Sequence, residues 1–343
     1  MNGIFRLLAA SAALFVSGCA HNQLLRMETK DYVATAQHAE AGGRAFYDGI
    51  IASDRALWVA LHEFDRNCTP RSLRVSYFDS DTNNDGLVDK NDEGIRCVTE
   101  PTPHSKVPSE DIDRATFAKQ YAALDFVASY LEALAEASAD PELKAADAFK
   151  QAAADLKVLF DLFKKQDPLD KDETAAIQGL VGLIDEMAKD TRSAAEIRAL
   201  VRERGPHADA AFVALSKWLM RDSSLKNATE ALSTNLNIIR AVDGRASDAV
   251  RGHIIERHYA GIDAQWAATR RYESCMARTK MPLQHFCAHP EAGLMYLAGQ
   301  SHHELVGLVE GNMNARQKAR FMKLQRAYFF RVASLFIDLI GAF

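Results

Sequence analysis

Apolar residues recur at intervals of three and four along most of the chain after about residue 41. This spacing places them on one face of an α-helix, whereas the two-residue alternation of a half-buried strand is almost absent. The pattern therefore predicts an all-α, multi-helix bundle. Clear examples are the stripes formed by Phe117, Tyr121, Leu124, Ala128 and Leu131, by Phe149, Ala153, Leu156, Phe160 and Phe163, and by Ile177, Leu180, Ile184 and Met187.

Polar residues, glycine and proline predict where several of these helices begin and end. Ser109 is expected to open the helix that carries the first stripe, and Asp140-Pro141 offers an N-cap followed by proline at the first helical position. Gly205-Pro206 predicts the end of one helix. A separate helix is then expected to carry Phe212, Leu215 and Leu219.

One segment, residues 66–105, interrupts the helical pattern. Its residues 73–78 and 94–98 have the composition of short strands, and the stretch between them is acidic and rich in asparagine. We therefore expect a small β-hairpin insert within a helical domain that spans residues 41–343.

The N-terminus has the parts of an export signal. Arg6 precedes the apolar or small residues 7–16, a run too short to span a bilayer as a helix. The run ends in Val16-Ser17-Gly18-Cys19, which resembles a bacterial lipobox. The resemblance implies that residues 1–18 are a lipoprotein signal peptide and that Cys19 carries the lipid. Residues 19–40 are then a lipidated, polar tether. The alternative is an ordinary cleaved signal in which Cys19 is incidental.

The resemblance to lipoproteins also implies a location. Ala20 follows the cysteine, in place of the aspartate that typically retains lipoproteins in the inner membrane. We therefore expect the protein to be anchored in the outer membrane, facing the periplasm, where the acyl chains contribute about 0.8 kcal/mol for each buried methylene. A source with a single membrane would remove this distinction.

Four cysteines remain once Cys19 is set aside. An even number in an oxidising compartment predicts disulfides, and four cysteines allow three pairings. Pairing of sequence neighbours is favoured, because each pair brackets a locally irregular segment. A zinc site built from all four thiolates is the alternative, although the chain contains no Cys-x-x-Cys. The favoured pairs are Cys68–Cys97, which would staple the insert, and Cys275–Cys287.

The acidic stretch inside the insert resembles the twelve-residue EF-hand calcium loop. Gly86 stands at the sharp turn, and Leu87 would offer its backbone carbonyl. The resemblance implies a structural Ca²⁺ ion, although Asp92 stands where the family has glutamate and is closer to a dockerin-type loop. The alternative is an acidic turn that binds nothing. The oxygen-bearing side chains at positions 1, 3, 5, 9 and 12 of the loop are those of Asp81, Asn83, Asp85, Asp89 and Asp92.

Two groups of residues could be considered for catalysis or metal binding. A step of five residues turns about 140° around a helix, so His253 and His258 do not share a face. No G-x-S-x-G, P-loop or G-x-G-x-x-G motif is present in the sequence. We therefore expect solvated or core-edge histidines and assign no catalytic residue. The groups are His253, Glu256 and His258, and His302, His303 and Glu304.

Composition limits the remaining functions. The 343-residue chain is 48% apolar with a formal net charge of −5, and losing Arg6 with the signal makes it slightly more acidic, so nucleic acid is not an expected partner. A non-enzymatic interaction or accessory role with an envelope protein is favoured. A carrier of a lipid or other apolar ligand, suggested by Phe329 and Phe330, and an envelope hydrolase that uses a His/Glu cluster are the alternatives. The three tryptophans, Trp58, Trp218 and Trp266, are expected in the core.

Overall fold

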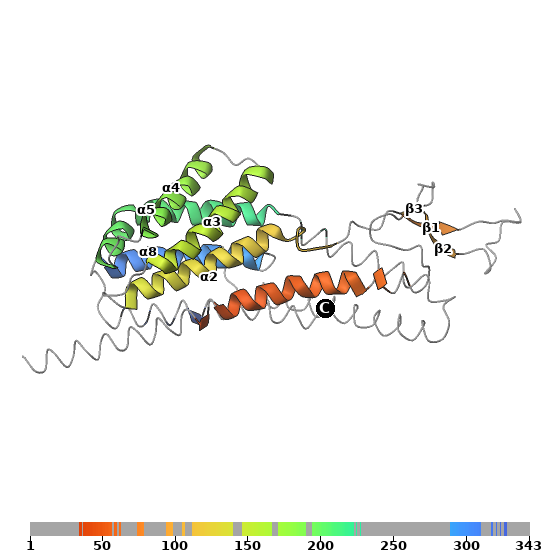
Figure 1. The fold of residues 1–343 in the computed structure, drawn as a ribbon, viewed down its shortest axis with the longest axis horizontal. Helices are drawn as coiled ribbons and strands as arrows, with labels where there is room; N and C mark the ends of the chain where they lie inside the picture. Colours follow the sequence, from red (N-terminus) through yellow and green to blue (C-terminus); the bar gives the residue numbers. More distant parts are fainter. Residues whose placement is uncertain are drawn as a thin grey trace, which may run out of the picture. The chain divides into compact units, whose positions relative to one another are not determined.

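The computed structural model confirms the helical bundle (Figure 1). The elements that the structure describes from end to end are the helices α2 (Ala118–Ala139), α3 (Ala146–Gln166), α4 (Lys171–Met187), α5 (Ala194–Met220) and α8 (Pro290–Val309), and the strands β1 (Arg74–Phe78), β2 (Gly94–Val98) and β3 (Ser105–Lys106). The residues that the structure describes are 34–35, 37–56, 58–59, 62, 74–78, 94–98, 105–106, 112–139, 146–166, 171–189, 194–222 and 289–309, with single positions 224, 227, 317, 320, 323, 326 and 327.

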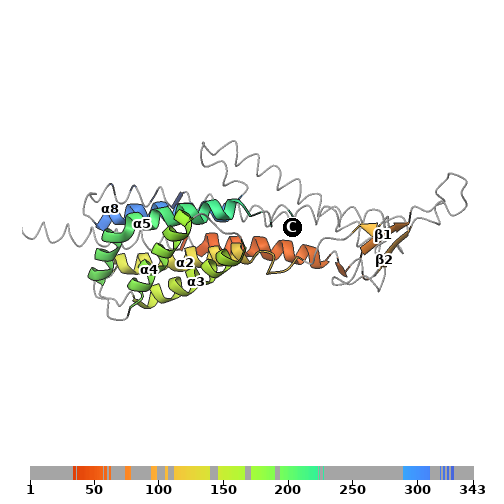
Figure 2. The same cartoon turned by 90° about the horizontal axis from the view of Figure 1, so that it is seen from above.

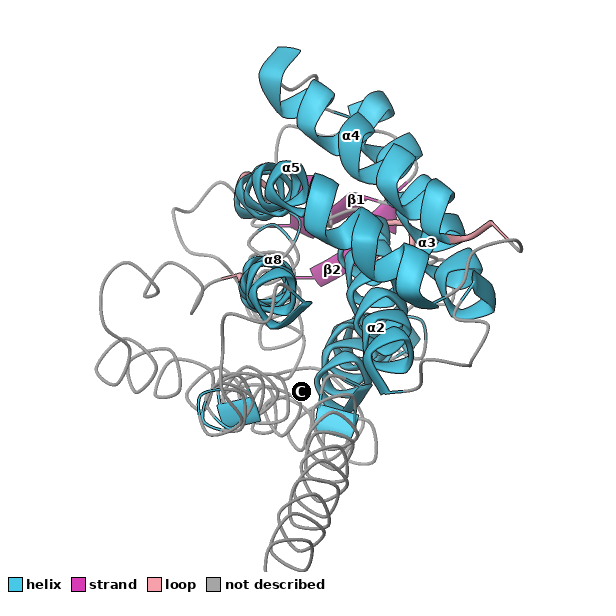
Figure 3. Cartoon of the chain, turned by 90° about the vertical axis from the view of Figure 1, so that its left-hand side faces the viewer, coloured by secondary structure: helices cyan, strands magenta, loops and turns pink. Residues whose placement is uncertain are grey.

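The described residues fall into two compact units, each treated by itself below. The first contains α3, α4, α5, α8 and nearly all of α2, and the second contains residues 44–56, the three strands and residues 112–117. In the first unit α8 packs along α5, α5 against α4, and α4 against α3. Figure 2 shows α8 beside α5, and Figure 3 shows the same pair nearly along their axes.

Aromatic side chains fill the core of the first unit. Phe212 of α5 stacks on Phe126 of α2, with ring centroids 6.0 Å apart and planes inclined by 17°. Phe163 of α3 meets Trp218 of α5 edge to face at 5.3 Å. Such pairs contribute about 0.5–1.5 kcal/mol each beyond the burial of their area. They therefore tie α2 and α3 to the same helix, α5.

Gly299 lets α8 approach α5 closely. A Cβ atom at this position would lie 2.6 Å from the Cβ of Phe212, which is too close for two non-bonded carbon atoms. The Ser216 hydroxyl donates a 2.9 Å hydrogen bond to the Ala292 carbonyl and forms a second contact between the helices. Phe212 precedes Ser216 on α5, while Gly299 follows Ala292 on α8, so the two helices run antiparallel.

Most residues of the apolar stripes predicted from the sequence are buried, and Ala153 of α3 is half-buried. Ile177, Leu180, Ile184 and Met187 of α4 are all 0% exposed, and Phe149, Leu156, Phe160 and Phe163 of α3 are also buried. The predicted start of α3 at Asp140-Pro141 lies outside the described residues. These helices follow the hydrophobic period because burial of each large apolar side chain contributes about 1.5–3 kcal/mol.

The predicted helix end at Gly205-Pro206 is wrong. Helix α5 continues from Ala194 to Met220 and includes the residues assigned to a separate helix. Proline removes one backbone hydrogen bond and costs about 3 kcal/mol in a helix interior. Buried residues lie on both sides of it, among them Leu200 and Ala208, and their packing outweighs this local signal.

Helix α2 begins later than the predicted start at Ser109, which lies outside the described residues. Residues 114–117 form a turn, and the helix proper starts at Ala118. The Asp113 carboxylate accepts hydrogen bonds from the backbone amides of Ala115 and Thr116 at 2.8 and 3.1 Å. Asp113 therefore supplies the capping that the sequence analysis assigned to Ser109.

The second unit joins residues 44–56, which are helical, to the segment that precedes α2. The rings of Tyr47 and Phe117 lie 4.8 Å apart. The fully buried Asp54 carboxylate accepts a 3.1 Å hydrogen bond from the backbone amide of Ile112. Residues 34–35 and 37–40, which belong to the first unit, are helical as well, and Ala39 is buried.

The strands form one antiparallel sheet with the order β2-β1-β3 (Figure 1). The two longer strands lie where strand composition predicted them. The short strand β3 pairs with Val75 and Ser76 of β1 and was not predicted. Phe78 pairs with Gly94, so the chain between β1 and β2 begins and ends at paired residues. The predicted calcium loop falls in that connection, at residues 81–92, and lies outside the described residues.

Alanine substitution should destabilise the protein at Gly299, which packs against Phe212, and stabilise it at Gly179 and Gly182. Gly299→Ala should lower the free energy of unfolding by about 1–3 kcal/mol, because the new methyl group overlaps Phe212. Among the described residues, and apart from the neighbouring backbone of α4 itself, no atom lies within 4 Å of a Cβ placed at Gly179 or Gly182. Alanine at either of these positions should therefore raise the free energy of unfolding by about 0.5–1 kcal/mol. Urea denaturation of the three single variants measures both effects, and a neutral Gly299→Ala variant would contradict the close packing.

Candidate functional site

A histidine and a tyrosine meet in the core of the first unit. The Tyr130 hydroxyl of α2 and Nδ1 of His302 on α8 share a short hydrogen bond, and both residues are 0% exposed. Their ring centroids lie 5.9 Å apart. The contact joins residues that are 172 positions apart in the chain and so fixes α8 against α2.

Aromatic rings enclose this pair. Phe212 lies 5.3 Å from the ring of Tyr130 and 6.1 Å from that of His302, and Phe126 lies 5.6 Å from Tyr130. Acid–base catalysis requires a histidine within hydrogen-bond reach of the reacting group. His302 is instead buried and hydrogen-bonded to a core tyrosine, so this contact ties α8 to α2. His302 is thus a core residue, and the expectation of a solvated or core-edge histidine is wrong here.

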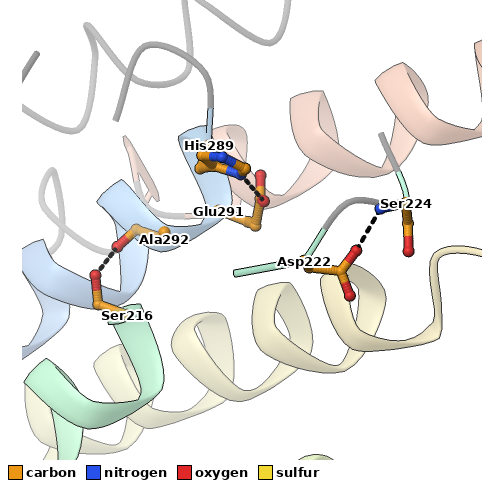
Figure 4. Close-up of polar contacts among 6 residues, drawn as sticks. All are labelled: Ser216, Asp222, Ser224, His289, Glu291 and Ala292. Carbon is orange, nitrogen blue, oxygen red and sulfur yellow. Dashed lines mark hydrogen bonds and ion pairs between the residues drawn. The ribbon is translucent and has the colours of Figure 1, made fainter. Parts of the chain in front are cut away.

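Polar contacts also organise the N-terminus of α8 (Figure 4). The His289 carbonyl accepts the first backbone hydrogen bond of the helix, from Gly293, and Pro290 occupies the first helical position. His289 Nδ1 lies 3.7 Å from the buried Glu291 carboxylate. A carboxylate in the first turn is stabilised by the positive end of the helix dipole, which explains how this acidic side chain is tolerated inside the fold.

Figure 4 also shows Asp222, which lies two residues after the end of α5. The Asp222 carboxylate accepts a 2.7 Å hydrogen bond from the backbone amide of Ser224, a helical position. This is the geometry of a helix N-cap, in which a side-chain oxygen satisfies a free amide of the first turn. Asp222 therefore separates α5 from the helical residue that follows.

Most residues singled out from the sequence lie outside the described part of the chain. Cys97 is on β2, opposite Val75. His303 and Glu304 belong to α8. The described residues contain no group of three or more His, Cys, Asp or Glu side chains that could hold a metal ion. The predicted residues beyond the described ranges are Cys19, Cys68, Cys275 and Cys287, the calcium-loop residues Asp81, Asn83, Asp85, Leu87, Asp89 and Asp92, and His253, Glu256 and His258.

Tyr130 and Asp54 are buried residues with polar groups that no sequence pattern predicted. Tyr130 lies four residues after Phe126 and next to the stripe residue Leu131, so the helical period could have indicated that its ring is buried in the core. Nothing local marks its hydroxyl as the partner of His302. Asp54 sits in a helix among apolar residues, and its bond to Ile112 depends on tertiary contact. The core assignment is confirmed for Trp58 and Trp218, while Trp266 lies outside the described residues.

Comparison of the chain with protein-family models, curated proteins and solved structures finds no match. Among the helices that the structure describes, none combines the length and apolar character needed to cross a membrane.

A double-mutant cycle should measure the Tyr130–His302 contact. Tyr130→Phe removes the hydroxyl but keeps the ring, and should cost about 1–3 kcal/mol because a buried imidazole nitrogen loses this partner. Removing the imidazole as well, in Tyr130→Phe with His302→Leu, should cost less than the sum of the two single changes by about 0.5–3 kcal/mol. Urea denaturation supplies all four free energies. Additive effects, within about 0.5 kcal/mol, would show that the two side chains are not coupled.

Proposed function

We propose that this chain is a lipid-anchored protein of the cell envelope with a non-enzymatic interaction or accessory role. The observation that carries the proposal is the sequence Val16-Ser17-Gly18-Cys19 at the end of a short apolar run. A lipid on Cys19 would hold the helical body at the periplasmic face of the outer membrane. A body held at one surface meets partners there repeatedly, because tethering raises their effective concentration.

The buried histidine favours this role over the hydrolase alternative. That alternative needs a histidine open to a substrate, next to a carboxylate or a nucleophile. His302 instead shares its hydrogen bond with Tyr130, is buried, and packs against Phe212. His302, one of the histidines considered for catalysis, therefore has a packing role in the core.

We further propose that the insert holds a structural calcium ion. The loop residues 81–92 carry five oxygen-bearing side chains in the order of an EF-hand loop. The pairing of Phe78 with Gly94 supports this, since paired antiparallel residues have Cα atoms only about 4.5–5.5 Å apart. Strands that bring the two ends of the loop together would let its first and last ligands converge, which is the task of the two helices in an EF-hand.

Disulfides would complete the insert. Cys97 lies on β2 opposite Val75, toward the end away from the loop, and Cys68 precedes β1 by a few residues. A Cys68–Cys97 bond would link the outer ends of the hairpin and contribute about 3 kcal/mol. The proposed Cys275–Cys287 bond would act in the same way on the segment before α8. Both bonds suit a protein that works in an oxidising compartment.

Substitution of Cys19 should release the protein from the membrane. In Cys19→Ala cells the chain should lose metabolically incorporated palmitate and move from the membrane fraction to the soluble periplasmic fraction. Cys97→Ala is the matched control, because it also removes one cysteine but should keep both the lipid and the membrane fractionation. Intact-mass analysis of the mature wild-type N-terminus gives the decisive measurement. An unmodified N-terminus would establish an ordinary signal peptide and remove the anchor.

Calcium titration should reveal the proposed metal site. The purified protein should bind about one Ca²⁺ ion with a dissociation constant on the order of 10⁻⁴ M, as in extracellular modules. Asp81→Ala combined with Asp85→Ala should abolish the heat of binding in isothermal titration calorimetry, because two carboxylate ligands are lost.

Substitution of Asp92, at the last position of the loop, provides a control that should strengthen Ca²⁺ binding. Asp92→Glu should bind Ca²⁺ more tightly than the wild type, because the longer side chain can offer both oxygens, as the glutamate of an EF-hand does. Equal, negligible heats for all three proteins would show that the segment is an acidic turn without a metal.

In-cell photo-cross-linking should identify the contact surface of the first unit. Val158 and Val213 are exposed on α3 and α5, at 55% and 39%, so a photoreactive residue at either position should leave the fold intact. A discrete cross-linked product with an envelope protein is expected from at least one position and should weaken when Cys19→Ala is added. A scan of exposed positions over the whole chain that yields no product would contradict an interaction role.

A further inference from the structure

We draw no further inference here: the strongest candidate, the exposed small-residue face of helix α4 around Gly179 and Gly182, is an unpartnered helix face, and nothing in the structure shows what covers it.

Discussion

The close approach of α8 to α5 is the constraint on which the rest of the helical core depends. Gly299 brings the backbone of α8 against Phe212, and the same phenylalanine stacks on Phe126 and contacts the rings of Tyr130 and His302. A side chain at position 299 would move α8 outward. The hydrogen bond between Tyr130 and His302 and the one from Ser216 to Ala292 both need α8 in its present place. The absence of a side chain at Gly299 therefore lets several separate contacts of α8 form at the same time.

The hydrophobic period carried most of the information about the helices, because the same burial that the period encodes is what stabilises them. Local signals at helix ends were less informative. Pro206 is a strong helix breaker by itself, yet α5 continues through it because apolar residues are buried on either side. Before α2 the capping residue is Asp113, whose carboxylate accepts hydrogen bonds from the amides of Ala115 and Thr116, and the sequence alone does not single it out among the nearby polar residues.

Candidate sites were harder to predict than helices. His302, His303 and Glu304 look like a cluster in the sequence, but consecutive residues on a helix project about 100° apart. The partner of His302 is Tyr130, far away in the chain, and no local pattern encodes that pairing. The proposed lipid anchor and the proposed calcium loop differ, because each is inferred from a contiguous stretch of sequence that resembles a known motif. Their positions can therefore be proposed from sequence even though they lie outside the described residues.

The long separation between the partners of α8 has a consequence for how the protein is made. The Ser216–Ala292 contact spans 76 positions and the Tyr130–His302 contact spans 172. Until α8 has been synthesised, the faces of α2 and α5 that carry Phe126, Tyr130 and Phe212 lack the helix that covers them. Loop closure over such distances slows folding, and exposed aromatic surface favours aggregation. The nascent chain can therefore bury these rings against α8 only after residue 302 has been made.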